Sequence, residues 1–141
     1  MKAKFIIVVG ALMAWSCTSD EPLTPVNQLP TISVTDGKQE ALGAFVSGAH
    51  PTSGTVKLVI DKTDASKKYL SFENFKTDPG PDLYIYLAED KNAKGFTSVA
   101  KLSKTGTFTL DIPSEAMTDK QKYVLVWCKQ FTVLFGSAKL E

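Results

Sequence analysis

The stretch that decides the fold of this chain is Val124-Leu125-Val126-Trp127-Cys128-Lys129-Gln130-Phe131-Thr132-Val133-Leu134-Phe135-Gly136. It is rich in β-branched and aromatic residues, which favour the extended, pleated backbone of a β-strand. Two strands are therefore predicted here, over Lys122–Cys128 and Phe131–Phe135, with Cys128 near the end of the first.

The alternation of side chains along the first of these strands predicts where Cys128 points. Successive strand residues face opposite sides, so Cys128 shares a face with Val124 and Val126, while Leu125 and Trp127 take the other. Both faces are apolar, which is typical of a central strand covered on both sides. Cys128 is therefore expected to be mostly buried and slow to react with thiol reagents.

The rest of the C-terminal 100 residues has the same period-2 pattern. Alternation of apolar and polar residues, broken by Gly, Pro, Asp and Ser, predicts strands at Thr55–Asp61, Tyr69–Phe75, Asp82–Glu89 and Thr107–Ile112. A helix is expected only as a short turn at Ser114–Lys120, where Ser114 can cap it. The predicted fold is all-β, an antiparallel β-sandwich or flattened barrel of about seven to eight strands.

The N-terminal residues have the pattern of an export signal. Lys2 and Lys4 precede the apolar stretch Phe5–Trp15, which is too short to span a bilayer but suits a signal peptide. Ala14-Trp15-Ser16-Cys17 then resembles a lipobox, loosely. Residues 1–16 are predicted to be a lipoprotein signal peptide, with Cys17 as the lipidated residue; the alternative is an ordinary cleaved signal followed by a chance cysteine.

Residues 17–37 are expected to be a lipid-anchored flexible tether, because three prolines lie among Thr, Ser, Asn and Asp. Residues 38–141 then form one β domain. The expected location is the bacterial cell envelope, extracytoplasmic and lipid-anchored, with the outer membrane or cell surface favoured. The acidic run Ser19-Asp20-Glu21 is interpreted equally well as a surface-export signal or as a solvated linker.

The charge of the chain argues against nucleic acid as a partner. All 16 basic residues are lysines, and removal of residues 1–16 leaves 14 lysines against 15 acidic residues, a net charge of −1. A near-neutral domain without arginine lacks the basic surface that binds phosphate backbones. The partners expected are a membrane, reached through Cys17, and a redox or protein partner that the sequence does not name.

Few residues of the domain can carry chemistry. Once Cys17 is lipidated, Cys128 is the only cysteine left and has no partner for an internal disulfide. His50 is the only histidine, so neither a zinc cluster nor a hydrolytic triad is predicted. Asp78-Pro79-Gly80-Pro81-Asp82 is interpreted as a structural turn rather than a metal site, because calcium needs six to eight oxygen ligands. Without further information, Cys128 is most simply a small buried hydrophobe.

Several spaced motifs resemble the electron-transfer DM-thirteen domain family, over roughly residues 42–140. They are Leu42-Gly43-Ala44-Phe45, His50 with Ser53-Gly54-Thr55-Val56, Asn74-Phe75, Gly80-Pro81-Asp82-Leu83-Tyr84-Ile85-Tyr86-Leu87, and Trp127-Cys128-Lys129 with Phe131, Val133, Phe135-Gly136, Ala138 and Leu140. The stretch Val99–Gly106 follows the family's glycine-rich segment only loosely.

The resemblance implies a β-sandwich-like fold and a redox role for the cysteine of the C-terminal motif, which is Cys128 here. That role is either a bare thiol or a ligand to a prosthetic group such as haem, with His50 as a second possible participant. From the residues alone, Tyr84, Tyr86, Phe131 and Phe135 are candidate lining for such a group, although aromatic residues at strand spacing more often belong to the core. Two hypotheses follow. The domain is a tethered redox or electron-transfer module that uses Cys128, or it is a ligand- or protein-binding module in which Cys128 only fills the core.

Overall fold

The computed structural model describes residues 37–141, and within them the chain forms eight β-strands and no helix. The predicted signal peptide, Cys17 and almost all of the predicted tether lie outside the described residues. The strands are β1 Gly37–Ser47, β2 Thr52–Asp61, β3 Lys68–Thr77, β4 Leu83–Ala88, β5 Thr97–Lys101, β6 Gly106–Asp111, β7 Tyr123–Cys128 and β8 Val133–Lys139.

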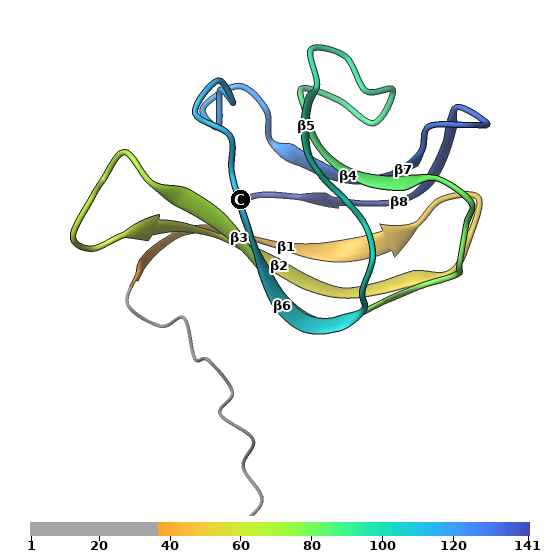
Figure 1. The fold of residues 1–141 in the computed structure, drawn as a ribbon, viewed down its shortest axis with the longest axis horizontal. Helices are drawn as coiled ribbons and strands as arrows, with labels where there is room; N and C mark the ends of the chain where they lie inside the picture. The colour runs from red at the N-terminus through yellow and green to blue at the C-terminus, as the bar shows by residue number, and fades with distance from the viewer. Residues whose placement is uncertain (1–36) are drawn as a thin grey trace, which may run out of the picture. The chain divides into compact units, whose positions relative to one another are not determined.

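All eight strands join one antiparallel sheet in the order β5-β4-β7-β8-β1-β2-β3-β6. The sheet curls into two layers, with β1, β2, β3 and β6 in one and β4, β5, β7 and β8 in the other (Figure 1). β1 links the layers, because its first part pairs with β2 and its last part, Phe45–Ser47, pairs with β8. The result is a nearly closed barrel whose two edge strands, β5 and β6, are left unpaired with each other along an open seam.

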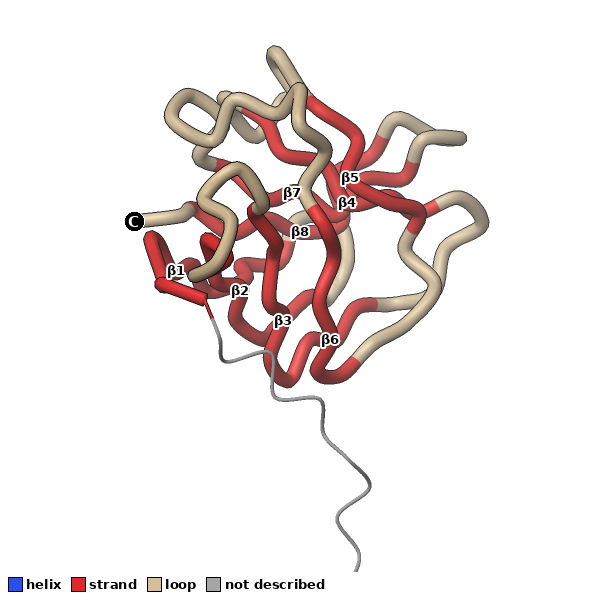
Figure 2. Tube along the Cα trace, turned by 60° about the vertical axis from the view of Figure 1, so that its left-hand side comes forward, coloured by secondary structure: helices blue, strands red, loops and turns tan. Residues whose placement is uncertain are grey.

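The prediction of an all-β fold is confirmed, and the differences are local. β1 and β5 were not predicted as strands, because glycines interrupt the pattern of β1 and β5 is a short edge strand without a fully buried face. Ser114–Lys120 forms hydrogen-bonded turns and no continuous helix (Figure 2), and the backbone N–H groups of Lys120 and Gln121 both donate to the carbonyl oxygen of Met117. The backbone N–H of Met117 donates to the side chain of Gln121 there, which ties the segment to its own end. Within residues 37–141, no helix is long and apolar enough to cross a membrane.

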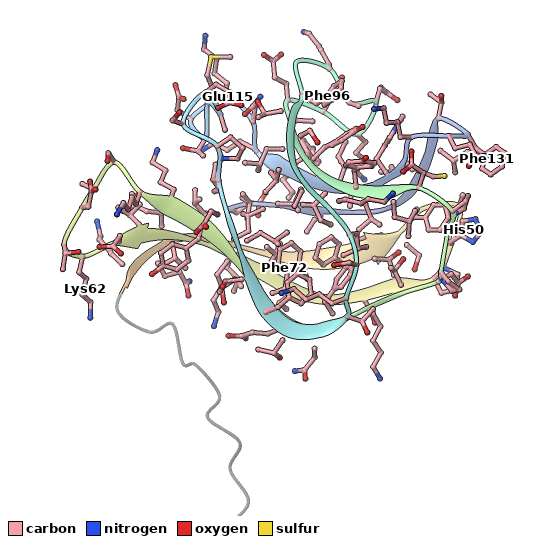
Figure 3. The ribbon with its side chains drawn as sticks, viewed as in Figure 1. His50, Lys62, Phe72, Phe96, Glu115 and Phe131 are labelled. Atoms are coloured by element: carbon pink, nitrogen blue, oxygen red, sulfur yellow. The ribbon has the colours of Figure 1, made fainter. Side chains whose placement is uncertain are left out.

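Aromatic rings fill the space between the two layers. Phe72 lies at the centre of the core (Figure 3), fully buried and stacked on Phe108 at 4.6 Å and on Phe45 at 6.0 Å between ring centroids. Phe75 meets Phe45 edge-on at 5.0 Å. Offset and edge-to-face rings at these separations attract each other in addition to burying apolar surface. This aromatic cluster holds the β1-β2-β3-β6 layer against the layer that carries Cys128.

Candidate functional site

Cys128 is the last residue of β7, and its side chain belongs to the barrel core. It is fully buried, in the same apolar cluster as Val124 and Val126, whereas Leu125 and Trp127 belong to a second cluster on the outer face of the sheet. β7 lies between β4 and β8, as expected of a central strand. The burial and direction predicted for Cys128 from alternation are therefore those that the structure shows.

The register places two core residues beside Cys128. Leu83 of β4 lies directly opposite on one side and Val133 of β8 on the other. The chain leaves the strand at Lys129, whose backbone N–H donates to the carbonyl oxygen of Asp82 at 2.9 Å. Directly opposed residues in a sheet have Cβ atoms about 4.5–5.5 Å apart, so Leu83 is the nearest cross-strand cover of the thiol on the β4 side.

The prediction that the last strand begins at Phe131 was wrong by two residues. Lys129–Thr132 forms the turn between β7 and β8, and β8 begins at Val133. Thr132 has φ of 56°, a left-handed conformation that is unusual for a β-branched residue. Phe131 lies at the tip of this turn and is 62% exposed, so it lines no interior site (Figure 3).

His50 lies in the connection between β1 and β2, near the same end of the barrel as the β7–β8 turn (Figure 3). Its Nδ1 is 3.3 Å from Oδ2 of Asp78, and its ring stacks on Phe135 with 3.9 Å between centroids. Both side chains of the His50–Asp78 pair are about half exposed. Within residues 37–141, no hydrogen bond or ring contact joins His50 to Cys128, and the ring of Phe135 occupies the inner side of the imidazole.

These positions do not fit a haem held by Cys128 and His50. An axial ligand must present its atom to an open pocket that also holds the macrocycle. Cys128 has no exposed surface, and neither Cys128 nor His50 lines the pocket beside Leu83 and Leu102 or two smaller pockets on the described residues. Of the candidate aromatic lining, Phe135 is packed into the core and Tyr84 and Tyr86 belong to the outer cluster.

The aspartates considered as metal ligands interact with other protein groups. Asp78 pairs with His50, while Asp82 pairs with Lys101 at 3.2 Å. Asp61 and Asp64 cap their own loop, and the hydroxyl and N–H of Thr63 lower the pKa of Asp61. Within residues 37–141, no three His, Cys, Asp or Glu side chains gather in a way that could hold a metal ion.

A row of half-buried apolar side chains crosses the outer face of the sheet, and no motif in the sequence marks it as a site. Tyr84, Trp127 and Leu134 are successive cross-strand partners on β4, β7 and β8. The ammonium groups of Lys101 and Lys129 lie 5.9 Å and 5.6 Å from the centre of the Tyr84 ring. We call Tyr84, Trp127, Leu134, Lys101 and Lys129 the outer row. The sequence signal for the outer row is that the outward-facing side of β7 is apolar and carries Trp127, whereas the exterior of a barrel is usually polar.

Tyr86 supports the outer row from beneath. It is 4% exposed, lies 6.4 Å from Trp127 and 6.1 Å from Tyr84 between ring centroids, and is covered by Phe96 at 4.3 Å. Burial, with smaller contributions from Tyr84 and Asp82, raises the pKa of Tyr86. The β4–β5 connection thus covers one side of the outer face and leaves the outer row partly open.

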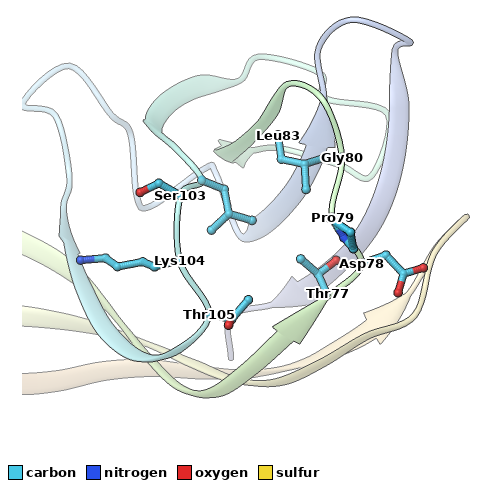
Figure 4. Close-up of a pocket in the computed structure, with 9 residues that line it drawn as sticks. Thr77, Asp78, Pro79, Gly80, Leu83, Ser103, Lys104 and Thr105 are labelled. Carbon is cyan, nitrogen blue, oxygen red and sulfur yellow. The ribbon is translucent and has the colours of Figure 1, made fainter.

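A pocket of about 330 Å³ lies on the open seam of the barrel. It is bounded by the two connections that pass between the layers, β3–β4 and β5–β6 (Figure 4). Leu83 and Leu102 supply its apolar wall, and the lining residues are Thr77, Asp78, Pro79, Gly80, Leu83, Leu102, Ser103, Lys104 and Thr105. Leu83 therefore lines the pocket and also lies opposite Cys128.

The family Electron transfer DM13 matches residues 44–140 of the chain, which is more than half of its length. The chain belongs to this family. The match runs from β1 to the residue after β8 and so includes all the strands around Cys128. No curated protein and no solved structure matches the chain.

The DM13 assignment gives electron transfer as the function of the family. The accessibility of the Cys128 thiol to reagents therefore bears on its redox chemistry, and it can be measured. In a Cys17→Ala background, where Cys128 is the only cysteine, we expect almost no reaction with a thiol reagent under native conditions and one thiol per chain after unfolding in guanidinium. The reason is the complete burial of the side chain. Native labelling as fast as that of a small free thiol would contradict the placement of Cys128 in the core.

Proposed function

We propose that this chain is a membrane-tethered, extracytoplasmic electron-transfer domain whose redox function depends on Cys128. The observation that carries the proposal is the DM13 match together with the position of Cys128, the free cysteine of the described residues. The core around the thiol excludes water and bulky reagents, which favours a protected redox group over an exposed nucleophile.

A partner that binds the outer face of the sheet at β7 can come close to the thiol without opening the core. Cys128 and Trp127 are adjacent on β7 and point to opposite faces, so the sulfur is separated from the outer row by the thickness of the sheet. The mechanism proposed here assigns no role to haem, because Cys128 and His50 do not share an open pocket. Electron exchange between an electrode and the wild type, compared with Cys128→Ala, tests the proposal.

A second candidate function is a binding module in which Cys128 only packs the core. The observation that favours it is the outer row, where half-buried aromatic and aliphatic side chains lie next to two lysines. Partly open apolar patches with a charged rim are typical of interaction surfaces. If Cys128→Ala and the wild type exchange electrons equally, or neither does, this second function accounts for the domain better.

The membrane tether is a separate part of the proposal, and it depends on Cys17. We expect labelled fatty acid to be incorporated into the wild type and not into Cys17→Ala when both are expressed in a bacterial host. The motive is the short apolar segment that ends in Ala14-Trp15-Ser16-Cys17. Equal labelling of both proteins, or of neither, would remove the lipid anchor from the account.

A further inference from the structure

The outer side of the β1-β2-β3-β6 layer carries a buried apolar patch, formed by Val59 of β2 and Tyr69 of β3. The two residues are cross-strand partners. Their neighbours Leu58 and Leu70 belong to the core, so alternation directs Val59 and Tyr69 to the opposite, outer side. Neither residue belongs to the two apolar clusters of residues 37–141, yet Val59 is only 6% exposed and Tyr69 only 7% exposed. Another part of the molecule must therefore cover this patch.

The chain enters the domain beside the patch. A Cβ at Gly37 would overlap both Cγ1 of Val59 and Oη of Tyr69, so the backbone of the first described residue lies against the two side chains. A register shift between Gln39 and Ala41 bends β1 at this point. Figure 1 shows the first residues of β1 turning toward the outer side of the layer. The residues immediately before Gly37 therefore emerge at the patch.

The sequence before Gly37 has the pattern of a strand with one apolar face. Thr31-Ile32-Ser33-Val34-Thr35 alternates polar and apolar residues, so Ile32 and Val34 share one side of an extended backbone. Val34 is three residues and Ile32 five residues from Gly37, which keeps both within about 18 Å of it. This length is enough to cross two neighbouring strands, which lie about 4.8 Å apart.

We propose that residues 31–35, the docking segment, pack on the outer side of β2 and β3, with Ile32 and Val34 against Val59 and Tyr69. Removal of these apolar side chains from water stabilises the docked form. The three polar residues of the docking segment then face solvent. The occupant of the patch is this segment and not a second copy or another protein, because its covalent attachment beside the patch gives it a high effective concentration there.

Docking sets how far the domain reaches from its proposed lipid anchor. Cys17 and Thr31 are 14 positions apart, a length that spans at most about 50 Å. Without docking, the 20 positions between Cys17 and Gly37 span at most about 72 Å. The docking itself depends neither on the lipid nor on the redox role of Cys128.

The first test measures the backbone order of the docking segment by heteronuclear NMR on the full chain in its Cys17→Ala form. We expect amide order parameters of about 0.85, the value of a rigid backbone. The methyl groups of Ile32 and Val34 should show nuclear Overhauser effects to the ring of Tyr69. Order parameters below about 0.6, or contacts of the Tyr69 ring with a second copy of the chain in place of Ile32 and Val34, would overturn the proposal.

A matched pair of double variants locates the contact within the sequence. Ile32→Ser/Val34→Ser should lower the order parameters of the docking segment below about 0.6 and shift the amide signal of Tyr69, because the apolar contact is lost. Leu23→Ser/Val26→Ser makes the same kinds of change earlier in the chain and should alter neither quantity. If the docking segment stays ordered in both double variants, Ile32 and Val34 do not hold it and the proposal is wrong.

Thermolysin, which cuts accessible chains before Ile, Val and Leu, tests the patch itself. Tyr69→Ala should speed cleavage before Ile32 and Val34 by about tenfold or more, because it removes the ring on which they pack. Tyr84→Ala, which removes a ring from the outer face of the other layer, should leave the rate unchanged. If Tyr69→Ala lacks a cooperative urea transition, Val59→Ala takes its place. Equal cleavage in the wild type and in the folded patch variant would overturn the proposal.

Discussion

Phe72→Ala is expected to lower the free energy of unfolding by about 3–5 kcal/mol, because it deletes a fully buried ring and leaves a cavity between the layers. The loss includes the stacking of Phe72 on Phe45 and Phe108. Small domains have only about 5–15 kcal/mol of stability in total, so the variant should be near the limit of folding at physiological temperature. Urea unfolding followed by circular dichroism measures the change.

The control is Phe131→Ala, which deletes an equally large ring from the tip of the β7–β8 turn. Phe131 is 62% exposed, so the free energy of unfolding should change by no more than about 0.5 kcal/mol. The urea midpoint of Phe72→Ala should therefore fall by about 1 M or more, while that of Phe131→Ala stays nearly constant. Similar midpoints for the two variants would contradict the central position of Phe72 in the core.

Cys128→Ala and Cys128→Ser are both expected to abolish electron transfer while keeping the fold. They differ in stability. Alanine loses about 1–2 kcal/mol through a small cavity, whereas serine buries a hydroxyl among apolar side chains at a cost of about 1–3 kcal/mol. Voltammetry of adsorbed protein measures the transfer, and circular dichroism checks the fold.

The outcome of this pair of variants separates the redox role from the packing role of Cys128. A redox wave that is present in the wild type and in folded Cys128→Ala would show that the sulfur is only core filler. A wave that is lost in both variants, each with a cooperative unfolding transition, agrees with the proposal. Trp127→Phe, which keeps an aromatic ring on the outer face and leaves Cys128 in place, should retain the wave.

Alternation along single strands was sufficient to predict much of the fold. The burial of Cys128 and the outward position of Trp127 follow from a period of two residues. The same reasoning could not find β5, because an edge strand with one solvated face and a bulge opposite Ile85 and Tyr86 has little regular pattern. Phe131 was assigned to a strand for its hydrophobicity, although a turn through the left-handed Thr132 places it outside.

The candidate sites depend on contacts between distant segments, which no local pattern contains. The pairing of His50 with Asp78 joins two connections that are 28 residues apart. The seam pocket arises from the sheet order, which puts the β3–β4 and β5–β6 connections on opposite sides of one opening. The identity of Cys128 as the residue to test came from the family motif, whereas its protection from solvent is a property of the packed barrel.

The measurement that tests the central claim most directly is a thiol count before and after electrons are withdrawn from the folded domain. The protein is the Cys17→Ala form, treated with excess ferricyanide, separated from it by gel filtration and then unfolded for titration. We predict one thiol per chain before treatment and one ferricyanide reduced for each thiol lost, because the thiol gives one electron to ferricyanide and its proton to solvent. On unfolding, two oxidised sulfurs join as a disulfide between chains, which dithiothreitol returns to one thiol per chain. An unchanged thiol count after the domain has delivered its electrons would contradict the account, because the redox group would then lie elsewhere.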